Sequence, residues 1–220
     1  MPPRRSTATV TPPAPAWRRP PDLELTPILS NALDAFFEMG FHGTTVRDIA
    51  RRVGITVPAL YYHHENKEAI LVALLDRSIT QLRQLCDEAL ADAGDDPVRR
   101  FLNLVECLVL YMAHSTKMAY IDHEFHVLSP EHRKSYTDKR RAIERLLHDA
   151  IRDGGAAGHF DVSAPTETAR ALLGMIQAVA TWFKPGGRHT ARAVAMRYLD
   201  IAAHTVGATP AVLAQVRALA

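Results

Sequence analysis

The sequence predicts an all-α protein, with an N-terminal three-helix domain, a C-terminal helical domain and about nine helices in total. Apolar residues recur at helical spacing in most segments between residues 27 and 206. Capping residues, or a proline in the first turn, mark the expected helix starts. No segment shows the alternation of apolar and polar residues that is typical of a half-buried β-strand. A chain of 220 residues can hold one small and one larger domain.

Residues 1–21 have a composition of their own. They contain seven of the chain's 14 prolines together with four arginines, and they show almost no apolar periodicity. Such a segment buries too little apolar surface to fold, so the sequence predicts a disordered, Pro/Arg-rich arm.

The first helix is expected to begin at Pro27, after Thr26 as its N-cap. It is expected to end at Gly40, and its core face comprises Leu29, Leu33, Phe36 and Phe37.

Residues 45–64 have the chemistry of two short helices joined by a tight turn. Thr45 and Asp48 fit a capping box at the start of the first of them. Gly54 follows its last apolar residue, where a left-handed conformation ends a helix without steric cost. Thr56 is expected to cap the second helix, with Pro58 in its first turn. These features predict a helix-turn-helix motif.

The second of these helices is short and ends in the aromatic run Tyr61-Tyr62-His63, away from any expected core. Asn66 then caps a further helix that begins at Lys67. Together with the preceding helix, these residues resemble the TetR family of transcriptional repressors, over residues 22–82. A generic helical hairpin would share the caps but not the segment from residue 60 to residue 68.

The resemblance implies how this domain binds DNA. In the TetR family the third helix enters the major groove, so the apolar start of that helix is expected to contact thymine methyl groups. Arg47 is expected to reach a base edge, because a guanidinium suits the two acceptors of guanine. Thr45 and Lys67 are expected to contact phosphates, while Tyr61 fits a packing role equally well. The DNA-binding residues implied are Thr45, Arg47, Thr56, Val57, Pro58, Ala59, Tyr61, Tyr62, His63 and Lys67. His64 departs from the family pattern, in which a bulky apolar residue is usual.

The remainder, residues 83–220, is expected to be a helical ligand-binding and dimerisation domain. A long helix from Asn66 to about Leu90 is expected to cross into it and to transmit displacements between the two domains. Further helices are expected over residues 97–112, around residues 119–127 and over residues 130–152. The last two strong helices, residues 164–183 and 191–206, are apolar nearly all round. We therefore expect another copy of the chain to cover them, in a homodimer.

Residues 180–187 resemble a branch of TetR regulators that controls lipid, fatty-acid or sterol catabolism, in which several members respond to acyl-CoA thioesters. Candidate ligand-binding residues are Tyr111, Met112, Tyr120, His123, Glu124, Arg140, Arg141, Met175 and Trp182. For the aromatic residues and methionines, the alternative is an ordinary place in the helical core. For the two arginines, the alternative to pairing with CoA phosphates is a solvated helix face.

Composition and motif spacing argue against other classes of protein. The formal net charge is only +2, so affinity for nucleic acid must come from a local patch. Cys86 and Cys107 lie within helical patterns, which argues against a disulfide framework and is expected of a cytoplasmic protein. No apolar run approaches a membrane span, and no signal-peptide segment is evident, so we expect no membrane partner. The pair His123-x-x-His126 lacks the H-E-x-x-H spacing. We therefore expect no metal, no cofactor and no enzymatic activity.

The whole sequence predicts a homodimeric, ligand-responsive repressor that binds double-stranded DNA at a palindromic operator. A hydrophobic small-molecule effector, with an acyl-CoA thioester as one candidate, is expected to release the DNA. The arm of residues 1–21 either adds phosphate or minor-groove contacts or is a solvated extension only. The alternatives are a TetR-like small-molecule-binding protein with no regulatory DNA target and a helical metal-dependent enzyme.

Overall fold

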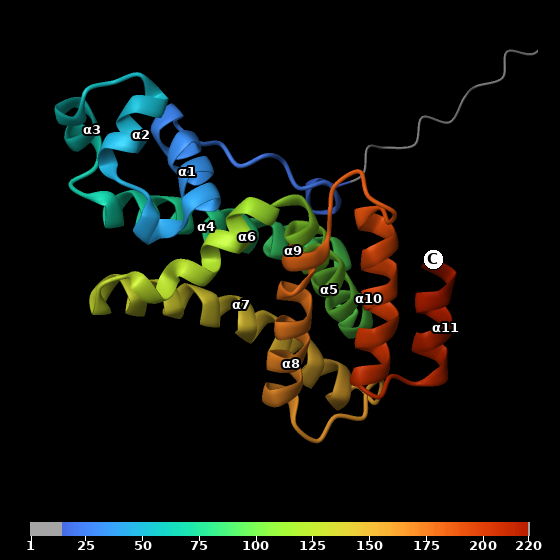
Figure 1. Cartoon of the computed structure of the whole chain (residues 1–220). Helices are drawn as coiled ribbons and strands as arrows, with labels where there is room; N and C mark the ends of the chain where they lie inside the picture. The colour runs from blue at the N-terminus through green and yellow to red at the C-terminus, as the bar shows by residue number, and fades with distance from the viewer. Residues whose placement is uncertain (1–14, 220) are drawn as a thin grey trace, which may run out of the picture.

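The computed structural model describes residues 15–219, and it confirms the all-α prediction, because these residues form only helices and loops (Figure 1). In chain order the helices are η1 (Ala16–Arg18), α1 (Pro27–Gly43), α2 (Val46–Val53), α3 (Val57–His63), α4 (Lys67–Ala93), α5 (Pro97–His114), α6 (Thr116–Asp122), η2 (His123–Val127), α7 (Pro130–Ala156), α8 (Pro165–Gln177), α9 (Val179–Trp182), α10 (Ala191–Thr205) and α11 (Pro210–Leu219). Within the described residues, no helix has both the length and the apolar character needed to cross a membrane.

The helices α1, α2 and α3 lie together at one end of the molecule, around the first turns of α4 (Figure 1). The centre of this group is apolar, because Phe36, Ile49, Leu60 and Ile70 have no exposed surface. From there α4 continues into the larger group of helices, so one rigid element belongs to both parts.

The helix α5 is at the centre of the larger group. It packs against α4, α7, α8 and α10, and every residue from Phe101 to Leu110 is buried. This burial includes Glu106, whose carboxylate pairs with the guanidinium of Arg18 at 3.2 Å.

The C-terminal helices differ from the sequence prediction. The segment expected as one helix over residues 164–183 is divided, since α8 ends at Gln177 and α9 begins at Val179. The N–H of Ala178 bonds to the Gly174 carbonyl at 3.2 Å, and the Thr181 N–H bonds to the Ala178 carbonyl at 3.0 Å, three residues back, at the start of α9. The sequence also missed α11, which packs against α10.

Residues 15–21 do not form the disordered arm that the sequence predicted. Trp17 is fully buried, and η1 packs against α4 and α5. The guanidinium of Arg18, besides pairing with Glu106, lies 4.4 Å from the centre of the Trp17 ring. Burial of one large indole therefore outweighs the proline and arginine composition of the segment. Residues 1–14 of the predicted arm lie outside the described part of the chain.

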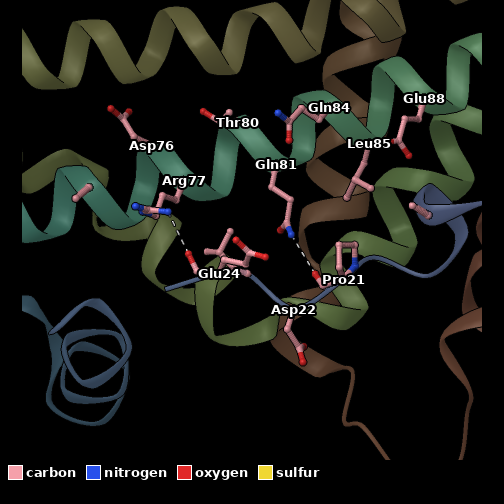
Figure 2. A pocket seen from close by; sticks show the side chains of 13 residues that line it. Pro21, Asp22, Glu24, Asp76, Arg77, Thr80, Gln81, Gln84, Leu85 and Glu88 are labelled. Carbon is pink, nitrogen blue, oxygen red and sulfur yellow. Dashed lines mark hydrogen bonds between the residues drawn. The ribbon is translucent and has the colours of Figure 1, made fainter. Parts of the chain in front are cut away.

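After η1 the chain runs along α4 as a strap, residues 19–25, which we call the N-terminal strap. The side chain of Gln81 donates to the Pro21 carbonyl at 3.0 Å, and that of Arg77 donates to the Glu24 carbonyl at 3.2 Å (Figure 2). An open groove of about 610 Å³ lies between the strap and α4, and eight of its 13 lining residues are polar or charged. Because the groove is open to solvent and lined by several charged side chains, it is unlike the enclosed site that a hydrophobic ligand requires.

Candidate DNA-binding surface and ligand cavity

The helix-turn-helix is held by local hydrogen bonds of the predicted kind. The Thr45 hydroxyl accepts from the Asp48 N–H at 3.1 Å, and the Asp48 carboxylate accepts from the Thr45 N–H at 3.1 Å, which confirms the capping box. The hydroxyl and amide of Thr45 also hold the pKa of Asp48 below its usual value. Gly54 has a φ of 79° at the end of α2, and Thr56 caps α3 through the Ala59 N–H.

These caps leave the outer side of α2 and α3 exposed. Arg47, near the start of α2, is exposed, and within the described residues it forms no ion pair, whereas Arg51 and Arg52 pair with Asp48 and Glu38. A free guanidinium at this place is available for a ligand outside the protein.

The surface of α3 combines small apolar groups with exposed aromatic rings. Tyr62 is 88% exposed and lies edge-on to the His63 ring at 5.4 Å. Half of Tyr61 is exposed, so it is not a core residue. The other residues predicted on this helix are the exposed Thr56, Pro58, Ala59 and His63 and the half-buried Val57.

Lys67 is not a freely extended side chain. Its ammonium donates to the carbonyls of Phe41 at 2.6 Å and Thr44 at 2.8 Å, and it lies 4.3 Å from the centre of the Phe41 ring. Burial lowers the pKa of this amine. The amine therefore holds the end of α1 through these two carbonyls. Its third N–H remains available for another partner.

The unusual histidine at position 64 is half-buried at the end of α3. Burial, with a smaller effect from His63, lowers its pKa. A neutral imidazole is thereby favoured, which explains how the chain accommodates a histidine where an apolar residue was expected.

A small, partly open cavity of about 60 Å³ lies among α4, α5, α6, α7 and α8. Three of the predicted ligand-binding residues, Tyr111, Met112 and Arg140, line it. Most of the wall is apolar, and it comprises Ile79, Leu82, Leu108, Met112, Ala119, Ile143, Leu173 and Ile176. The polar part of the wall comprises Ser78, Tyr111, Asp122, Tyr136, Arg140 and Gln177.

The other predicted ligand-binding residues are not brought to this cavity. Tyr120, on α6, faces α1, where its ring meets Phe37 edge-on at 5.2 Å. Trp182 is 45% exposed on α9. The remaining four also lie outside the cavity wall: His123, Glu124, Arg141 and Met175. Helical spacing identifies which residues share a helix face, but not which helix that face meets.

The polar groups of the cavity form two clusters. In the first, Asp122 accepts a hydrogen bond from the Tyr136 hydroxyl and one from the Arg140 guanidinium at 2.8 Å. In the second, the Tyr111 hydroxyl donates to the Ser78 carbonyl at 3.0 Å. Burial raises the pKa of Tyr111 to about 12 and that of Tyr136 well above its usual value, so both phenols are neutral donors.

Sequence reasoning missed Asp122 and Tyr136 as lining residues. One signal was present, because Tyr136, Arg140 and Ile143 are spaced by four and three residues and share one face of α7. The acceptor, Asp122, belongs to a different helix and had no such signal. In the described part of the chain, no three His, Cys, Asp or Glu side chains are grouped as a metal site requires.

Two family models match the chain. That of the bacterial regulatory proteins of the tetR family matches residues 28–74, and that of the tetracyclin repressor-like C-terminal domain matches residues 94–206. The transcriptional repressor KstR2 of Rhodococcus jostii is 29% identical over 187 residues, which cover 80% of this chain and 87% of KstR2.

Solved structures agree with these matches. The ketosteroid transcriptional regulator KstR2 of Mycobacterium tuberculosis superposes with a TM-score of 0.75 at 25% identity, over 83% of this chain and 94% of that one. AibR, in complex with isovaleryl coenzyme A and operator DNA, gives a TM-score of 0.70 at 25% identity, over 83% and 97%. Since one family model spans half of the sequence and a second covers its helix-turn-helix, the chain belongs to the tetR family of bacterial regulatory proteins.

Proposed function

We propose that this protein is a homodimeric transcriptional repressor that binds a palindromic operator and releases it when a hydrophobic small molecule enters the cavity. One observation carries the proposal. The helix α4 begins at the helix-turn-helix and, further along, contributes Ser78, Ile79 and Leu82 to the cavity wall. A movement of the helices around the cavity is therefore expected to displace α4, which also supports the DNA-binding helices.

The exposed side of α2 and α3 is assigned to the major groove. Arg47 reads a base edge, Pro58 and Ala59 meet thymine methyl groups, and Tyr62 and His63 contact the backbone or bases. The exposure of these residues and the free guanidinium of Arg47 support this assignment. The start of α2, with Thr45 as its N-cap, is assigned to a phosphate; the Thr45 N–H and hydroxyl both donate to Asp48, so a phosphate contact by Thr45 requires one of these bonds to be exchanged.

The dimer is assigned to α8 and α10. The outer side of α8 exposes the small residues Ala171, Gly174 and Ala178, which allow a second helix to approach closely. Nearby apolar side chains are also exposed, since Trp182 is 45% and Ile201 43% accessible. A two-fold dimer presents two copies of α3 about 34–36 Å apart, or a multiple of that spacing, which requires a palindromic operator.

An acyl-CoA thioester is the effector class that the relatives favour, because AibR is described with isovaleryl coenzyme A. A cavity of about 60 Å³ is far smaller than the roughly 300–1,000 Å³ of an ordinary ligand site. The effector must therefore stabilise a state in which the surrounding helices have moved apart. Such a ligand shifts the population away from the DNA-binding arrangement.

The test uses the promoter DNA of the protein's own or adjacent genes and fluorescence anisotropy at several salt concentrations. Arg47→Ala is expected to weaken binding by about 1–3 kcal/mol and to relax the preference at one base position. Arg145→Ala, a change of an exposed arginine on α7, is the matched control and should leave binding unchanged. Equal affinities of the wild type and Arg47→Ala for every operator variant would show that the surface is misassigned.

A further inference from the structure

We propose that Asp122, Tyr136 and Arg140 form the effector-sensing contact, at which the carboxylate of an acidic, otherwise apolar ligand replaces the carboxylate of Asp122. The inference rests on the proposed ligand-responsive function. It adds to that function a chemical class of ligand and the one contact inside the protein that the ligand breaks.

The contact joins two helices across one end of the cavity. Both donors are on α7, at Tyr136 and Arg140, whereas the acceptor, Asp122, is the last residue of α6. All three residues line the cavity, and the wall beyond them is largely apolar. A ligand with a carboxylate at one end and an apolar body therefore matches the whole wall.

Both donors lie on one helix, α7, so they stay together when the surrounding helices move apart and can hold a different carboxylate. The Arg140 guanidinium also lies 5.0 Å from the centre of the Phe125 ring, so Asp122 is not its only contact. A guanidinium can bind a carboxylate with two parallel hydrogen bonds, whereas it makes a single one, to Asp122, among the described residues. The ligand can thus form a better pair than the one it replaces.

Charge balance makes the exchange selective. Asp122 and Arg140 together are neutral, so an entering anion that left Asp122 in place would add an unpaired negative charge to a largely buried site. Asp122 has a route to solvent, because its side chain is 25% exposed and that of Arg140 is 26% exposed. An alcohol or ester of the same chain length carries no charge, so it cannot replace the Asp122 carboxylate in the pair with Arg140.

Release of Asp122 frees the end of α6, and α6 is bonded to the DNA-binding domain. The ammonium of Lys117 lies 2.6 Å from the Asp34 carboxylate on α1, and the Tyr120 ring packs edge-on against Phe37. The ligand therefore binds the state in which α6 is released better than the state in which Asp122 is held. That difference in affinity is what a population shift requires.

The experiment measures ligand binding and DNA release separately, with the full-length protein. The probes are hexanoate, octanoate and decanoate, each paired with the alcohol of the same chain, and octanoyl-CoA as the thioester arm. Calorimetry is expected to detect binding of the acids but not of the alcohols. Saturating acid is expected to weaken promoter binding by about 5- to 150-fold.

Variants identify the residues responsible. Arg140→Met should lose both the binding of the acids and their effect on DNA, Arg140→Lys should restore part of both, and Arg145→Met, outside the cavity, should behave as the wild type. Asp122→Asn should bind promoter DNA more weakly than the wild type without any ligand, because α6 is already less firmly held. Circular dichroism melts check that each variant is folded.

The outcomes are distinct. Equal binding of acids and alcohols, an unchanged response of Arg140→Met, or no binding of any acid would overturn the inference. If octanoyl-CoA releases DNA from the wild type and from Arg140→Met alike, the proposed function stands without this contact. If the acids bind through Arg140 but the protein does not bind promoter DNA, the contact stands and the proposed function fails.

Discussion

At the scale of the residue, the ammonium of Lys67 has hydrogen bonds within the protein and a predicted contact with DNA. The sequence predicts a phosphate contact, while the structure has its ammonium on the carbonyls of Phe41 and Thr44. Phe41 lies in the last turn of α1 and Thr44 directly follows that helix, so the amine holds the end of α1 beside the start of α4. The phosphate contact stays a prediction, and the third N–H of the Lys67 ammonium is available for it.

Lys67→Ala is expected to lower the free energy of unfolding by about 1.5–3 kcal/mol, the range for hydrogen bonds to a charged group. If the amine also meets a phosphate, the same change reduces the slope of log affinity against log salt by about one. Urea unfolding and salt-dependent anisotropy measure the two effects. The control is Lys134→Ala, since Lys134 is 79% exposed and should change stability by no more than about 0.5 kcal/mol. Loss of salt slope without loss of stability would contradict the structural role.

At the scale of the element, α7 is capped by a residue of α4. Ser129 precedes α7 but makes no side-chain cap, and the Glu68 carboxylate accepts the Ser129 N–H instead, at 2.8 Å. The same carboxylate lies 2.8 Å from Nδ1 of His132, in the first turn of α7. The start of α4, beside the helix-turn-helix, is thus joined to the helix that carries Tyr136 and Arg140.

The stability of this contact between α4 and α7 is expected to depend on pH. The hydrogen bond with His132 lowers the pKa of Glu68, and Glu68 in turn raises the pKa of His132. The stabilisation by the imidazolium is therefore complete below the ordinary histidine pKa of about 6.5 and is lost as the pH rises through the raised value. On the acid side it is lost as the pH falls through the lowered pKa of Glu68.

An NMR titration of the His132 ring should give a pKa above the ordinary value. In Glu68→Gln the pKa of His132 should return toward the ordinary value. Identical His132 titrations in the wild type and Glu68→Gln would show that the two side chains do not interact in solution.

At the scale of the whole molecule, the exposed sides of α8 and α10 form the proposed dimer interface. The sequence predicts helices apolar nearly all round, and the structure leaves Ile201 on α10 and Trp182 beyond α8 almost half exposed. In the proposed dimer, the exposed small residues of α8 let two copies meet at close range. We expect the operator spacing to depend on this proposed interface, because the interface would fix the separation of the two α3 helices.

Ile201→Glu and Ala171→Arg are therefore expected to convert a dimer into a monomer, because each places a charge in the proposed interface. Loss of the second half-site contact should weaken operator binding by about 10²-fold or more. Sedimentation velocity and anisotropy measure the two effects. Ala91→Glu, an exposed position on α4, should remain dimeric. A wild type that sediments as a monomer at concentrations that saturate the operator would rule out the dimer.

The sequence by itself determined the helix-turn-helix, because its signals act over three or four residues. Thr45 with Asp48, Gly54, and Thr56 with Ala59 hydrogen-bond or turn locally, so the chemistry of neighbours is sufficient. Helix formation also depends on residues three or four apart, which is why the all-α fold could be predicted from the sequence. This locality also explains why the boundary between α8 and α9 was missed, since no proline or capping side chain marks it.

Only the tertiary structure decided which distant residues meet. Arg18 pairs with Glu106, 88 residues away, and the burial of Trp17 beside them places residues 15–21, the described end of the expected disordered arm, against the core. Lys67 reaches back to Phe41, and Asp122 crosses from α6 to α7. Helical periodicity fixes the face on which a residue lies but not the helix that the face will meet, because that choice depends on the packing of all the helices together.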